Sequence, residues 1–197
     1  MIGFTSPYFW YSTRVTGFVA LILLTVVLVM GILISTRVGG RRIGRFEINE
    51  IHRALSMTAM IFVGIHIVAT VVDTYVPTGW ISALIPFTSP YKSLDISIGT
   101  VAFDLMLAVW LTSLLKERIE PRVWRAVHWA SYASFVAAAT HAFVIGTDHR
   151  THWGLAVLAG CVAVVALATV WRILGRPTRA AGRTALSPLQ GPSKGAR

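Results

Sequence analysis

The sequence predicts an all-α integral membrane protein: a bundle of five transmembrane helices with the N-terminus outside and the C-terminus in the cytoplasm. Of the 197 residues, 55% are hydrophobic and only 13% are charged, whereas soluble domains average about 25% charged residues. Five apolar runs are each long enough to cross a hydrocarbon core of about 30 Å. They cover residues 14–36, 51–74, 96–116, 124–146 and 152–174.

The distribution of basic residues predicts the orientation. Fifteen of the 18 lysines and arginines lie in or beside the first loop, the third loop and the C-terminal end, which leaves Arg14, Lys92 and Arg150 for the other side. Cytoplasmic loops carry the excess of Lys and Arg, so we expect the C-terminus inside and the N-terminus outside. The same asymmetry accounts for the net charge of +10, and we expect membrane lipid rather than nucleic acid as a partner.

Three segments make up the predicted domain organisation. Residues 1–13 are rich in aromatic side chains, which is typical of an outer interfacial segment. Residues 14–174 form the membrane domain, whose first run is too long for the apolar part of a signal peptide. Residues 175–197, rich in Gly, Pro, Ser and Arg, are expected to be a disordered cytoplasmic tail. No Gly-rich nucleotide motif is found, so we expect no flavin or nicotinamide site in this chain.

Four histidines lie inside the second and fourth predicted helices, where ionisable side chains are costly and by default indicate function. Both helices run from the cytoplasm outward, so matched positions along them lie at matched depth. His52 and His128 are near the cytoplasmic ends, and His66 and His141 follow them by 14 and 13 residues. At 1.5 Å per residue these steps are ~21 Å and ~20 Å. The sequence therefore predicts two histidine pairs at two depths.

These pairs predict two haems, one held by His52 and His128 and the other by His66 and His141, because a haem iron accepts one imidazole on each face. The haems would be b-type, since no Cys-x-x-Cys-His attachment motif is present. The alternative is a haemless transporter or proton relay in which the histidines make interhelical hydrogen bonds. The angle between the two histidines around the axis of the fourth helix fits this pairing less simply. A 14-residue step returns within ~40° of its start but a 13-residue step ends ~140° away, so that helix must tilt, kink or present its ligands on different faces.

Other polar residues are weaker candidates. Arg14, at the outer end of the first helix, would pair with a propionate of the outer haem or lie near an electron acceptor; the alternative is that it snorkels to the lipid headgroups. Arg53 and Arg125, beside the inner histidines, have the same two readings, propionate contact or positive-inside anchor. Asp104, in mid-span, needs a partner or a proton.

For three further residues an ordinary structural role is the expected interpretation. His149 and His152 lie in a short outer loop, where they are either solvated side chains or a surface contact for a metal or ferric chelate. Cys161 is the single cysteine, so there is no disulfide framework, and we expect it to serve in packing.

These residues resemble the ferric reductase-like transmembrane domain, the membrane half shared by ferric reductases and NADPH oxidases. The resemblance covers roughly residues 14–174. The chain is also similar to actinobacterial stand-alone members, in which the segment corresponding to Gly146-Thr147-Asp148 follows the last ligand position, here His141. It rests on His52-Arg53, His66, the segment Trp124 to Trp129, Tyr132 and His141.

The resemblance implies a di-haem b-type cytochrome in a bacterial cytoplasmic membrane, an oxidoreductase component that carries electrons outward. An arginine similarly placed to Arg14 lies near the outer haem in the oxidases. Those enzymes usually have six helices and a fused flavin and nicotinamide domain, whereas this chain shows five helices and no such domain. A separate cytoplasmic flavoprotein or quinol is therefore the expected donor, as for the related haem subunit that serves methionine sulfoxide repair. The acceptor is expected outside.

Overall fold

The computed structural model describes residues 7–36, 45–73, 76–146 and 151–174. Within these ranges it contains five long α-helices, one 3-10 turn and no β-strand, which confirms the predicted all-helical class. The helices are α1 (Pro7–Thr36), α2 (Arg45–Val72), α3 (Ser93–Leu114), α4 (Pro121–Ile145) and α5 (His152–Leu174), and the turn is η1 (Trp80–Ala83).

Helices α1 to α4 begin earlier than the predicted apolar runs, whereas α5 begins at the predicted residue, His152. The N-terminal aromatic residues, expected in a separate interfacial segment, form the first turns of α1. Proline occupies the first position of both α1 and α4, where its fixed φ favours helix initiation and its missing N–H costs nothing. Residues 1–6 and the predicted tail, 175–197, lie outside the described residues.

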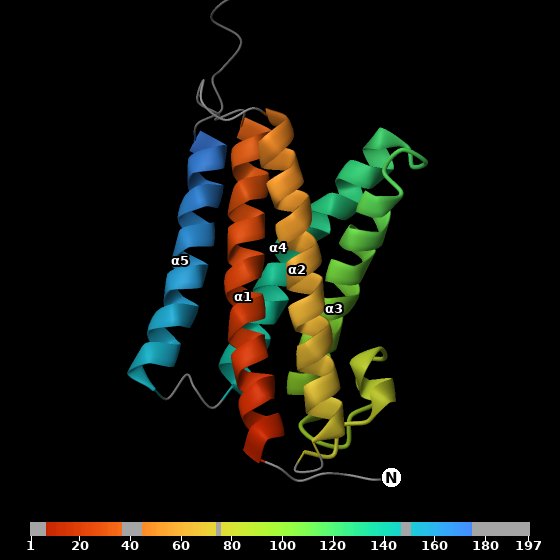
Figure 1. The fold of residues 1–197 in the computed structure, drawn as a ribbon, viewed down its shortest axis with the longest axis vertical. Helices are drawn as coiled ribbons and strands as arrows, with labels where there is room; N and C mark the ends of the chain where they lie inside the picture. Colours follow the sequence, from red (N-terminus) through yellow and green to blue (C-terminus); the bar gives the residue numbers. More distant parts are fainter. Residues whose placement is uncertain (1–6, 37–44, 74–75, 147–150, 175–197) are drawn as a thin grey trace, which may run out of the picture.

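Two antiparallel helix pairs organise the bundle: α1 packs along α2, and α3 packs along α4. Figure 1 shows α1 and α2 in the centre, with α5 on one side and α3 on the other. Helix α4 crosses behind α1 and α2 at a pronounced tilt, and it also contacts α5. This oblique crossing brings α4, the second histidine-bearing helix, across the face of the α1–α2 pair.

Four helices, α1, α2, α3 and α5, are long and apolar enough to cross a membrane. The chain is therefore a multi-pass membrane protein, and many large apolar side chains on its surface, such as Leu167 and Ile173, are well exposed, as lipid contact requires. Helix α4 was expected to be a fifth span, but its own composition does not reach that hydropathy because it carries two arginines and two histidines.

The core lies where α1, α4 and α5 meet. Its largest buried members are Leu21, Leu28, Phe135 and Leu158, and Cys161 packs beside them. The packing role expected for this cysteine is therefore confirmed. The loop between α2 and α3 is fastened to the bundle as well, since the Thr100 hydroxyl donates to the Ser82 carbonyl over 2.7 Å.

A buried serine of α4 forms a hydrogen bond directly to α3. The buried Ser134 hydroxyl donates to the Ala102 carbonyl over 2.8 Å. Hydrogen bonds between helices in membranes contribute about 0.6 kcal/mol on average and up to about 1.7 kcal/mol.

We predict that Ser134→Ala lowers the free energy of unfolding in detergent by an amount in this range. Thr140→Ala is the control, because that exposed hydroxyl bonds only within α4; equal effects of the two changes would contradict the prediction.

Candidate functional site

The four intramembrane histidines form two facing pairs between α2 and α4. The ring centroids of His52 and His128 are 6.4 Å apart, and those of His66 and His141 are 6.5 Å apart. Helix α4 is continuous from Pro121 to Ile145, so its two histidines lie on different faces of the helix. The tilt of α4 across α2 lets both reach their partners (Figure 1). The pairing expected from matched depth is thus what the fold produces.

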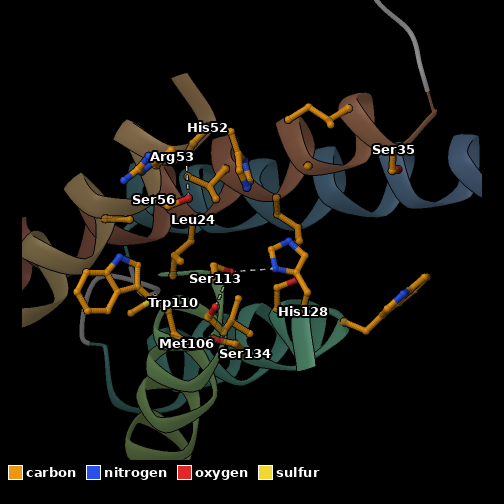
Figure 2. A pocket seen from close by; sticks show the side chains of 18 of the residues that line it. Leu24, Ser35, His52, Arg53, Ser56, Met106, Trp110, Ser113, His128 and Ser134 are labelled. Atoms are coloured by element: carbon orange, nitrogen blue, oxygen red, sulfur yellow. Dashed lines mark hydrogen bonds between the residues drawn. The ribbon is translucent and has the colours of Figure 1, made fainter. Parts of the chain in front are cut away.

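A cavity of about 900 Å³ opens around the first pair. Figure 2 shows the imidazoles of His52 and His128 facing each other across it, with Ser113 beside His128. Its walls come from α1, α2, α3 and α4, and Arg172 of α5 also contributes. Small-molecule and cofactor sites have volumes of about 300 to 1,000 Å³, so the space is large enough for a cofactor.

The second pair is oriented by backbone carbonyls of the neighbouring helices. Nδ1 of His66 donates to the Thr13 carbonyl of α1 over 2.8 Å, and Nδ1 of His141 donates to the Asp95 carbonyl of α3 over 2.9 Å. A neutral imidazole that donates from Nδ1 carries its lone pair on Nε2. Metal-ligating histidines are commonly fixed by such a hydrogen bond, which sets the tautomer and the ring plane.

Two glycines make these contacts possible. A β-carbon at Gly17 would lie 3.1 Å from the His66 ring, and one at Gly99 would lie 2.6 Å from Cε1 and Nδ1 of His141. Each glycine follows the accepting carbonyl by four residues, so it lies one turn further along the same helix face. The absent side chain leaves the room in which the imidazole reaches the backbone.

The first pair has the same plan with two changes. His52 lies against Gly31, where a β-carbon would be 3.5 Å from Cε1, and its ring lies near the backbone of Val27, four residues before Gly31. Its buried Nδ1 makes no hydrogen bond to a described residue. His128 instead meets Ser113, whose Oγ lies 3.5 Å from Nδ1.

The site therefore contains a repeat of small residues, which the positions of the histidines alone did not reveal. Each histidine faces a small residue on the preceding helix of its antiparallel pair. These small residues are themselves 14 positions apart on α1 and again on α3, as His52 and His66 are on α2. The signal was present in the sequence, but only the helix pairing shows which of its 16 glycines matter. The facing residues are Gly17, Gly31, Gly99 and Ser113.

The geometry of both pairs fits a haem. An imidazole nitrogen lies about 2 Å from a metal that it ligates, so two rings that bind one iron from opposite sides stand about 6 Å apart between centroids. The centroids observed are 6.4 and 6.5 Å apart. Two protein ligands also suit a macrocycle that supplies the rest of the coordination. No cluster of three or more metal-binding side chains occurs in the part of the chain that the structure describes.

Charged residues surround the first pair's cavity. Its lining contains four cations and two acids, and Arg172 donates to the Tyr132 hydroxyl over 2.6 Å while it lies over the Trp129 ring. Near the second pair, Arg14 lies over the Trp10 ring at 4.0 Å, one residue after the carbonyl that accepts from His66. The charged lining residues are Glu50, Arg53, Lys116, Glu117, Arg125 and Arg172.

The remaining candidates stay outside these pairs. Asp104 is half-buried in α3, and no described residue makes a hydrogen bond or ion pair with it, so the expected partner is not found there. His152 is the exposed first residue of α5. His149 lies outside the described residues.

Comparison with known protein families decides the affiliation. Residues 16–139, well over half of the chain, match the family described as "Ferric reductase like transmembrane component". The chain belongs to this family. The ferric reductase-like match includes His52, His66 and His128 and ends two residues before His141, so the structure adds the fourth histidine by its position opposite His66. No curated protein and no solved structure matches the chain.

Proposed function

We propose that this chain is a di-haem b-type cytochrome, the membrane subunit of a ferric reductase-like system that moves electrons from a cytoplasmic donor to an outer acceptor. The protein resides in a bacterial cytoplasmic membrane, and its electron donor is a separate flavoprotein or quinol. Membership of the family indicates a role in membrane electron transfer. The observation that carries the finer proposal is the spacing of the two histidine pairs, 6.4 and 6.5 Å between ring centroids.

The proposal assigns His52 and His128 to one haem and His66 and His141 to the other. Each haem, when bound, would supply reversible one-electron chemistry at its iron. The protein contributes the orientation of the ligands: Nδ1 of His66 and His141 is held by a carbonyl, which directs Nε2 of each ring toward the partner helix. The cationic side chains of the first cavity have the charge to bind propionates, and Arg14 has it near the second pair.

The alternative, a haemless proton relay, receives less support from the contacts. A relay needs hydrogen-bonded groups that can pass a proton onward. The carbonyls of Thr13 and Asp95 that accept from His66 and His141 cannot release one. The two rings of each pair are also too far apart to bond to each other directly.

The direct test of the proposal is the absorption spectrum of protein purified from haem-replete cells. We expect reducible Soret and α bands of b-type haem, with two haems per chain. His66→Ala should remove or perturb one haem and leave the other, because the two pairs lie on separate turns of α2 and α4. His152→Ala, at an exposed position, is the control and should retain both. Absence of the bands from the wild-type protein would refute the proposal.

The facing glycines give a second, sterically graded prediction. Gly99→Ala places a β-carbon 2.6 Å from the His141 ring, whereas Gly31→Ala places one at an ordinary 3.5 Å from His52. Displacing His141 breaks its hydrogen bond to Asp95, and loss of such outer contacts typically costs about 10- to 100-fold in metal affinity. We therefore expect Gly99→Ala to lower haem content at the second pair and Gly31→Ala to leave both haems bound. Haem-to-protein ratios measure this; comparable losses in both variants would contradict the steric account.

A further inference from the structure

Ser113 is the exception among the four residues that face the histidines. At Gly17, Gly31 and Gly99 there is no side chain between the imidazole and the helix backbone. At position 113 a hydroxyl intervenes: it donates to the Val109 carbonyl over 2.7 Å and meets Nδ1 of His128 at 3.5 Å. Val109 precedes Ser113 by four residues, as Asp95 precedes Gly99. Figure 2 shows the hydroxyl between His128 and α3.

The intervening hydroxyl weakens the hydrogen bond that His128 makes. Its proton is committed to Val109, so the oxygen can only accept from Nδ1, and it does so at the outer limit of hydrogen-bond length. His141, at the other depth of α4, has a direct carbonyl acceptor at 2.9 Å. A strong acceptor on the outer nitrogen makes an imidazole a more basic ligand, and a more basic ligand stabilises the ferric state.

The charges around the first pair act in the same direction. Four cations and two acids line its cavity, and net positive charge disfavours the more positive ferric state. Among the described side chains beside the second pair, Asp95 is balanced by Lys92 at 3.9 Å, which leaves the single cation Arg14 near the Thr13 carbonyl against a net two positive charges at the first pair. Hydrogen bonding and charge thus both favour reduction at His52 and His128.

We propose that Ser113 is a positioning residue that raises the reduction potential of the haem held by His52 and His128 above that of the other haem. This inference rests on the proposed function. It makes the two haems inequivalent: at equilibrium the first electron resides at the end that carries the cationic lining. Electron transfer from that end to the second pair would then be energetically uphill, and the potential difference between the donor and the outer acceptor would drive it.

The test is a redox titration of the full chain followed at the α band. His66→Ala, which retains the first pair, identifies the haem concerned. Ser113→Gly exposes the Val109 carbonyl to His128, so the potential of this haem should shift to a more negative value. Ser113→Ala removes the hydroxyl but keeps a β-carbon over the carbonyl, so the shift should be to a more positive value. Ser113→Thr keeps a hydroxyl at this position and should keep the wild-type potential.

Thr112→Ala is the matched control. Thr112 precedes Ser113 on α3 and is not among the residues that line the cavity, and its hydroxyl donates over 2.7 Å to the carbonyl four residues earlier, that of Ala108, as Ser113 does to Val109. It should leave both potentials unchanged. Opposite shifts for the glycine and alanine variants, confined to one haem, support the inference. With the b-type spectrum intact, the inference is overturned by potential shifts of the same sign in the glycine and alanine variants, by equal shifts of both haems, or by no shift. Absence of that spectrum from the wild-type protein would instead refute the proposed function.

Discussion

The close approach of an imidazole ring to the backbone of the neighbouring helix is the contact on which the site depends. At the second pair it is a hydrogen bond of 2.8 Å to Thr13 and one of 2.9 Å to Asp95. In a low-dielectric interior an unsatisfied N–H is costly, so this bond holds the ring in its orientation. It also leaves Nε2 as the atom available between the helices.

This contact accounts for the arrangement of the bundle. An imidazole reaches the carbonyl only where the facing residue is glycine, as at Gly17 and Gly99, so α1 and α3 must run closely antiparallel to α2 and α4. The 14-residue interval on α2 is matched by the same interval between the facing residues on α1 and on α3. Only α4 departs from it, with 13 residues between its histidines, and its tilt compensates (Figure 1).

The sequence was sufficient to predict the helical class, the four histidines and their pairing, because intramembrane histidines are rare and depth follows directly from helix rise. It was insufficient for the facing residues, since Gly17, Gly31 and Gly99 look like ordinary helix-packing glycines until the partner helix is known. Ser113 was invisible for the same reason. The helix starts were also misjudged, because the polar first turn of α2 and the aromatic first turns of α1 are helical without being continuously apolar.

The central claim is that each histidine pair binds one haem iron through two imidazoles. Low-temperature EPR of the oxidised protein tests it most directly. The ring planes are 60° apart at His52 and His128 and 87° apart at His66 and His141, and strongly crossed imidazole planes give highly anisotropic low-spin ferric signals. The account predicts two such signals, with the stronger anisotropy at the second pair. A high-spin ferric signal at the stoichiometry of either haem, in protein that retains all four histidines, would contradict it.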